Sequence, residues 1–184
     1  MEIKITTKQV LKVLYVLSWI IFVGLCVEAG GIIFNAIFTM TMNPLSARQF
    51  WEGIDLSALF EFDKGQFLVE TLLMSIVGIL KAILFYLIVK ILHDKKLDLA
   101  QPFNLDLKRF IANMAWLALG IGLFSQWGAG YTKWLVSKEI TMPDIQILQF
   151  GGADVWLFMG IILFVIAQIF KRGIEIQSEN DLTI

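Results

Sequence analysis

Four long apolar stretches alternate with polar connections along the chain. Residues 10–38, 67–92, 110–134 and 154–172 are each long and apolar enough to cross the roughly 30 Å hydrocarbon core of a bilayer as a helix. A polar segment, residues 173–184, follows the last stretch. The pattern predicts an all-α membrane protein, a single domain with four transmembrane helices.

The first and third connections, residues 39–66 and 137–154, are longer than a simple turn requires. Both contain apolar residues, and apolar and polar positions alternate in Leu59 to Asp63 and in Asp144 to Phe150. Because alternation with a period of two is typical of strands, we expect short strands in these two loops, lying beside each other.

The composition agrees with a membrane protein and removes several classes of function. Hydrophobic residues make up 58% of the chain and charged residues 17%, with a mean hydropathy of +0.75, which leaves too little polar surface for a water-soluble fold of 184 residues. One cysteine and one histidine exclude an intramolecular disulfide and a metal site built from several of either. Without phosphate-binding, zinc-protease or nucleophile-elbow motifs, we expect no catalytic residue, cofactor or metal, and no enzyme.

Basic residues predict the orientation. Ten lie on the side of the two termini and four on the other, so both termini are expected in the cytoplasm and the two long loops outside. The first group is Lys4, Lys8, Lys12, Lys90, Lys95, Lys96, Lys108, Arg109, Lys171 and Arg172, and the second is Arg48, Lys64, Lys133 and Lys138. The alternative, a signal peptide cleaved near Ala29, is disfavoured because apolar residues resume over 32–38.

A lysine, Lys81, stands in the middle of the second apolar stretch, where a charge needs a partner. When residues are counted from the cytoplasmic ends of two antiparallel helices, the depths of Glu28 and Lys81 in the membrane differ by about 6 Å. A lysine side chain can span this difference. We therefore predict an intramembrane pair of Glu28 and Lys81. The pair is either a site for a proton or substrate, or a structural ion pair that fixes the register of the two helices. Because the sequence offers only one such pair, the structural role is favoured.

Four further polar residues fall within the apolar stretches. Glu70 lies close to the outer interface, where its side chain is expected to extend to water. The other three are candidate hydrogen-bond partners of the predicted pair: Asn35, Asn113 and Gln126.

Small residues recur at helical spacing on the last two apolar stretches. Ala115, Ala118, Gly122 and Ser125 form one stripe, and Gly160 and Ala167 lie one heptad apart on the next helix. Such stripes let neighbouring helices approach closely.

The end of the chain is its most distinctive part. A basic pair is followed by Gly173, an acidic segment and the sequence Glu-Asn-Asp-Leu-Thr, and the middle loop contains a Pro-Phe pair. Together with the four-helix layout, these features resemble the bacterial membrane family catalogued as domain of unknown function 2975. The resemblance implies a four-helix inner-membrane protein. Genes of such proteins often lie beside a small helix-turn-helix regulator.

That association implies a membrane component that binds a transcription factor through its loop and tail, with no direct contact to nucleic acid. An equally weighted alternative is that the tail folds back on the basic loop 95–109. A function of a different class is a small transporter or channel subunit that uses Glu28 and Lys81. The candidate docking residues are Pro102, Phe103, Gly173, Glu175, Glu179, Asn180, Asp181, Leu182 and Thr183.

Overall fold

The computed structural model describes residues 7–94 and 103–181 and is built from helices. Each of the four long helices is long and apolar enough to cross a membrane, which confirms the predicted fold class. The long helices are α1 (Thr7–Thr41), α3 (Lys64–His93), α4 (Leu105–Ser137) and α5 (Ala153–Asp181). The first long connection holds three short helices: η1 (Pro44–Gln49), η2 (Trp51–Gly53) and α2 (Ser57–Phe62).

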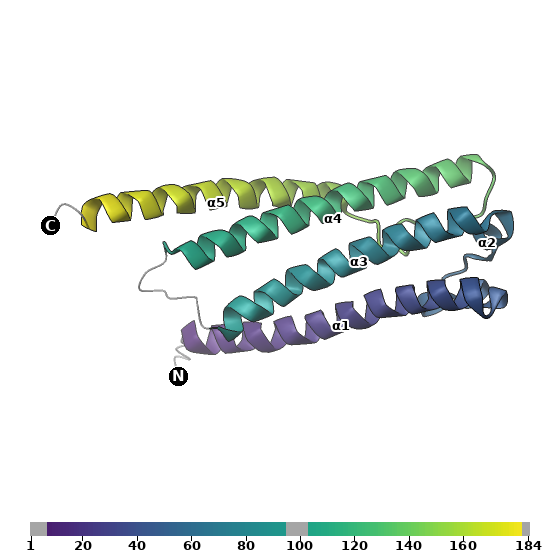
Figure 1. Cartoon of the computed structure of the whole chain (residues 1–184), viewed down its shortest axis with the longest axis horizontal. Helices are drawn as coiled ribbons and strands as arrows, with labels where there is room; N and C mark the ends of the chain where they lie inside the picture. Colours follow the sequence, from purple (N-terminus) through teal and green to yellow (C-terminus); the bar gives the residue numbers. More distant parts are fainter. Residues whose placement is uncertain (1–6, 95–102, 182–184) are drawn as a thin grey trace, which may run out of the picture.

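The long helices lie in an open row in the order α1, α3, α4, α5 (Figure 1). Each packs on its neighbour in the row, and within the described residues α1 contacts neither α4 nor α5. Along the helix axes, the beginning of α1 and the end of α5 lie at the same end of the molecule, which we call the terminus end. The opposite end of the helices, with the first and third connections, is the loop end.

Helices α1 and α3 contact each other along their length. Near the middle, a Cβ atom added to Gly78 would lie 3.2 Å from the Cβ atom of Ala29, so the two backbones approach closely. Near the terminus end, the hydroxyl of Tyr15 lies 3.0 Å from Nδ1 of His93. These contacts fix the antiparallel register of the two helices.

Small residues also hold α4 against α5, and these are the residues whose spacing predicted a close helix approach. Ala115, Ala118 and Ser125 are fully buried. Gly122 packs against Leu157, and Gly160 packs against Leu119. A larger side chain at either glycine would separate the helices.

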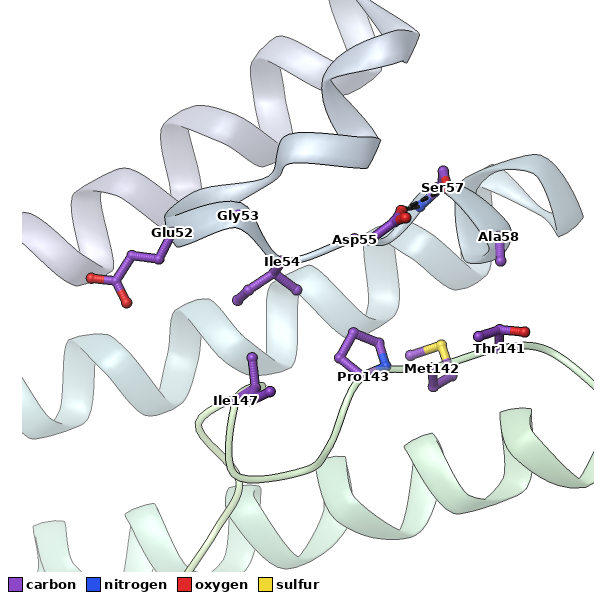
Figure 2. Close-up of a pocket in the computed structure, with 10 residues that line it drawn as sticks. All are labelled: Glu52, Gly53, Ile54, Asp55, Ser57, Ala58, Thr141, Met142, Pro143 and Ile147. Atoms are coloured by element: carbon purple, nitrogen blue, oxygen red, sulfur yellow. Dashed lines mark hydrogen bonds between the residues drawn. The ribbon is translucent and has the colours of Figure 1, made fainter.

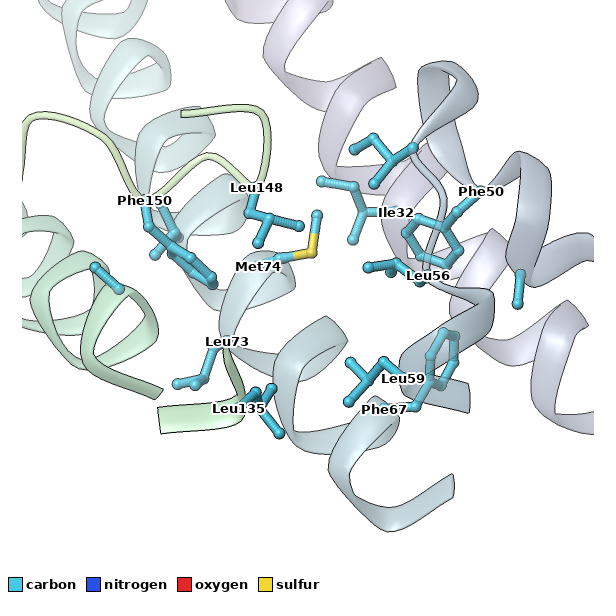
Figure 3. Packing of buried hydrophobic residues seen from close by; sticks show 14 of the residues in the cluster. Ile32, Phe50, Leu56, Leu59, Phe67, Leu73, Met74, Leu135, Leu148 and Phe150 are labelled. Carbon is cyan, nitrogen blue, oxygen red and sulfur yellow. The ribbon is translucent and has the colours of Figure 1, made fainter. Parts of the chain in front are cut away.

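The third connection, residues 138–152, folds inward instead of remaining outside the row. Because Leu157 lies level with Gly122, α5 begins about 16 Å deeper than the end of α4. The connection fills this space with Leu148 and Phe150, which are 0% and 1% exposed. Figure 3 shows both side chains beside Met74 of α3, in the core that the two connections share with the helices.

The strands expected in the two loops are not present within residues 7–94 and 103–181. Leu59 and Phe60 instead belong to helix α2, which ends at Phe62, and both side chains are buried. The carboxylate of the next residue, Asp63, accepts a hydrogen bond from the backbone N–H of Gln66 and caps α3. In the third connection, Asp144 accepts a hydrogen bond from the backbone N–H of Gln146 and forms a turn. Side-chain capping thus replaces strand pairing at both places.

The last helix also extends further than its apolar stretch. It was expected to end near residue 172, with a separate tail over 173–184, but α5 continues to Asp181. The first part of the predicted tail is therefore helical.

The contact between Gly128 and Phe150 should be needed to hold the third connection inside. A Cβ atom at Gly128 would collide with the buried ring of Phe150, whereas one at Gly130 on the same helix would meet nothing within 4 Å. We expect Gly128→Ala to lower the free energy of unfolding by roughly 1–3 kcal/mol. Gly130→Ala should leave it unchanged or raise it, because alanine favours a helix. Thermal unfolding in detergent measures both, and equal stability of the two variants would contradict the contact.

Candidate functional site

The amine of Lys81 is bound by the inward-folded connection. Lys81 lies near the midpoint of α3, and its Nζ donates to the backbone oxygen of Gln149 at 3.3 Å and to Oε1 of the same residue at 3.2 Å. Helical side chains lean toward the N-terminus of their helix, which for α3 is the loop end. Lys81 therefore extends toward the connection, and Gln149 meets it with a left-handed backbone, φ +69°.

Gln149 takes the position that was predicted for Glu28. Glu28 is level with Lys81, since its neighbour Ala29 packs on Gly78, and it acts on Lys81 electrostatically. Between these two described residues, however, no N–O contact of 4.0 Å or less forms an ion pair. The physical reason is that the third connection enters the row and brings two oxygen acceptors to the amine. The side chain of Glu28 remains partly exposed.

The carboxyl group of Glu70 is buried rather than extended to water as predicted. Its residue is 0% exposed, because α4 packs over this part of α3. Oε1 accepts a hydrogen bond from the hydroxyl of Thr132 at 2.7 Å, and that hydroxyl lies 3.0 Å from the backbone oxygen of Gly128. Oε2 has no hydrogen-bond partner within the described residues. Nearer the loop end, Tyr131 donates to the side chain of Gln66, so polar contacts join α3 to α4 at two adjacent levels.

The other predicted hydrogen-bond partners do not reach Glu28 or Lys81. Asn35 donates to the backbone oxygen of Gly31 within its own helix, at 2.8 Å. Asn113 and Gln126 are exposed on α4. In the part of the chain that the structure describes, none of the three binds Glu28 or Lys81.

A cavity of about 390 Å³ lies at the loop end between the first and third connections. Ile54 and Ile147 face each other across it (Figure 2). Asp55, which also lines it, accepts hydrogen bonds from the hydroxyl and backbone N–H of Ser57, and these bonds, with the nearby charge of Arg48, lower the pKa of the Asp55 carboxyl. The sequence indicated that the two connections lie together, but the left-handed residues Glu52 and Gly53 that shape one wall gave no recognisable pattern.

At the terminus end, the structure brings two predicted docking residues into contact. The ring of Phe103 packs against Gly173, and its centroid lies 5.4 Å from that of Phe170. Glu175 forms an exposed ion pair with Arg172 at 3.2 Å.

The remaining predicted docking residues are described in part or not at all. Glu179 is exposed near the end of α5. Pro102, Leu182 and Thr183, and the side chains of Asn180 and Asp181, lie outside what the structure describes.

The hydrogen bond to Glu70 can be tested by changing Thr132. Thr132→Val keeps the shape of the side chain but removes the donor, leaving both carboxyl oxygens without a partner, so we expect the free energy of unfolding to fall by roughly 1–3 kcal/mol. Thr132→Ser keeps the hydroxyl and serves as the matched control, which should lose less. Thermal unfolding in detergent provides the measurement, and an equal loss in both variants would assign the effect to packing alone.

Comparisons with known proteins identify a family. No curated protein and no solved structure matches the chain. The family described as "Protein of unknown function (DUF2975)" matches residues 36–184, from the last turns of α1 to the end of the sequence. The match covers most of the chain, including α3, α4 and α5, and agrees with the resemblance carried by the tail. The chain therefore belongs to the family described as "Protein of unknown function (DUF2975)".

Proposed function

We propose that this chain is a non-enzymatic regulatory component of a bacterial inner membrane that binds a cytoplasmic helix-turn-helix transcription factor at its terminus end. The sequence has ten basic residues in or next to its two terminal segments and its second connection, against four in or next to the first and third connections, and this excess supports a cytoplasmic location of both termini. The partner class comes from the family resemblance, and the binding surface comes from the geometry of α5.

The observation that carries the proposal is the length of α5. Phe103, two residues before the start of α4, packs on Gly173, so everything after Gly173 lies beyond the beginning of α4. Residues 174–181 form a helical projection, about 12 Å long, that we call the α5 arm. Figure 1 shows α5 extending past the ends of both α4 and α1.

The chemistry of the α5 arm fits a protein partner. Ile176 is 46% exposed, and the acidic residues Glu175 and Glu179 lie on the same short helix. An apolar residue flanked by acids on a projecting helix suits a groove with a basic rim, because helix-in-groove recognition uses apolar anchors and complementary charge. DNA-binding proteins commonly present basic surfaces.

The alternative, a small transporter or channel subunit, is favoured by one observation. Lys81 is kept at mid-membrane depth within electrostatic range of Glu28, and intramembrane ionisable residues often mark a pathway. Its contact with Gln149 supports the competing interpretation, in which Lys81 anchors the third connection. The two functions make different predictions for the same variants.

Removal of the α5 arm should abolish partner capture. The full chain and a chain ending at Gly173 are isolated from membranes of the source bacterium, and a purified candidate helix-turn-helix protein is titrated against each. We expect binding to the full chain only, because the truncated chain lacks the projecting residues but keeps the contact between Phe103 and Gly173. The control is Ile169→Ala, an exposed α5 residue within the membrane-spanning part, which should bind like the full chain. Binding by the truncated chain would contradict the proposal.

Substitutions at the intramembrane residues should leave partner capture intact. Lys81 on α3 and Glu28 on α1 lie far from the α5 arm. The regulatory proposal therefore expects Lys81→Met and Glu28→Gln to leave the affinity for the helix-turn-helix protein unchanged. Size-exclusion chromatography establishes that each variant is folded. Loss of binding in a folded variant would contradict the assignment of partner capture to the α5 arm alone.

A further inference from the structure

A polar groove lies between α3 and α4 at the terminus end, apart from the α5 arm and from Lys81. Its volume is about 190 Å³. This is smaller than the roughly 300–1,000 Å³ of sites that enclose a whole small molecule, so it suits a head group of a larger ligand. The lining residues are Leu87, Lys90, Ile91, Asp94, Asp106, Arg109, Phe110 and Asn113.

Three charged side chains of this groove are unpaired. Lys90 and Asp94 lie four residues apart on α3 and its C-cap, a spacing that allows an ion pair, and Arg109 lies on α4. Within residues 7–94 and 103–181, none of the three forms an ion pair or a side-chain hydrogen bond. Two cations and two anions thus border one cavity. Asp106 already takes part in an interaction of its own, whereas Lys90, Arg109 and Asp94 do not neutralise each other, and a ligand can complete these three.

The position of the groove identifies the ligand as a lipid. Lys90 is in the last turn of α3 and Arg109 is one turn inside α4, so their long side chains reach the level of the phospholipid phosphates. Leu87, Ile91 and Phe110 form the apolar part of the lining, on which the first segments of an acyl chain can pack.

The arrangement of the charges identifies the head group. A phosphate bound by Lys90 and Arg109 gains charge-assisted hydrogen bonds, and the guanidinium of arginine can contact two phosphate oxygens at once. The carboxylate of Asp94 is then left to accept hydrogen bonds from a cation. The hydroxyls of an anionic glycerol head group donate only hydrogen bonds with an uncharged donor, which are weaker than those of an ammonium, and a quaternary ammonium has no N–H to donate. A primary ammonium satisfies it.

We propose that this groove binds a zwitterionic phospholipid with a primary amine, of the phosphatidylethanolamine type, with its phosphate between Lys90 and Arg109 and its ammonium at Asp94. The proposal is independent of the regulatory function, because the residues that carry it lie on α3, its C-cap and α4, and none belongs to the α5 arm.

The test measures which lipid stays with the purified full chain. The protein is exchanged into detergent containing equal amounts of phosphatidylethanolamine, phosphatidylglycerol and phosphatidylcholine with identical acyl chains, and the bound lipid is quantified by mass spectrometry. We expect phosphatidylethanolamine to be enriched about tenfold over the other two, since a hydrogen bond to a charged group contributes about that factor. Equal retention of all three lipids, or of none, would overturn the proposal.

Charge substitutions make the test specific. Asp94→Asn should abolish the preference for phosphatidylethanolamine over phosphatidylglycerol while lipid is still bound. The double substitution Lys90→Gln and Arg109→Gln should release all three lipids. The matched control, Lys133→Gln with Lys138→Gln, removes two exposed cations from the loop end and should change nothing. Equal losses in the two double variants would show general charge attraction and overturn the site.

Two further experiments distinguish a lipid from a soluble ligand and a loss of charge from a loss of folding. Excess free phosphoethanolamine should leave the bound lipid in place, because it lacks acyl chains, and displacement at low millimolar concentration would assign the groove to a soluble phosphate ester. The exchange Lys90→Arg with Arg109→Lys keeps both charges. It should retain the lipid even if the glutamine variant fails to fold, and loss of lipid from this folded variant would contradict the proposal.

Discussion

A lysine in the middle of a membrane-spanning helix must find hydrogen-bond acceptors, because the bilayer core supplies none. Lys81 finds two of them on a single residue, Gln149, which belongs to a connection rather than to a helix. This contact requires the third connection to enter the row, and α5 then begins about 16 Å deeper than the end of α4. A helix that begins deeper and runs to Asp181 extends past its neighbours at the opposite end. The inward loop and the projecting α5 arm are therefore two consequences of one arrangement.

Close helix contacts at small residues hold this arrangement together. In a membrane, hydrocarbon surrounds the helices, so burial of apolar side chains between them contributes little and close packing contributes more. Gly78 lets α1 approach α3, Gly122 and Gly160 let α4 and α5 interlock, and Gly128 receives the ring of Phe150. Each contact joins only neighbours in the row. The outer helices α1 and α5 consequently keep most of their apolar surface for lipid.

The four-helix fold could be predicted because the sequence patterns that indicate it are local. The contacts of Lys81 in the middle of the helices could not, because they depend on segments that are distant in the sequence. Apolar length placed the four helices, and small residues such as Gly122 marked faces for close helix approach, although the spacing did not tell which two helices would meet. Helix counting also placed Glu28 level with Lys81. It could not reveal Gln149 as the partner, since nothing in residues 138–152 indicates an inward course. Glu70 was misplaced for the same reason: depth along one helix does not tell which neighbour covers it.

The distribution of polar groups distinguishes the two ends of the row. At the loop end and the centre, buried polar side chains such as Glu70 and Thr132 bind each other, and loss of one partner is costly because no water replaces it. At the terminus end, Lys90, Arg109 and Glu179 are exposed, and changing an exposed charge alters stability little. A surface that can vary without unfolding the protein is suited to recognising ligands and partners. Both proposed sites, the lipid groove and the α5 arm, lie at this end, while the loop end and the centre hold the helices in register.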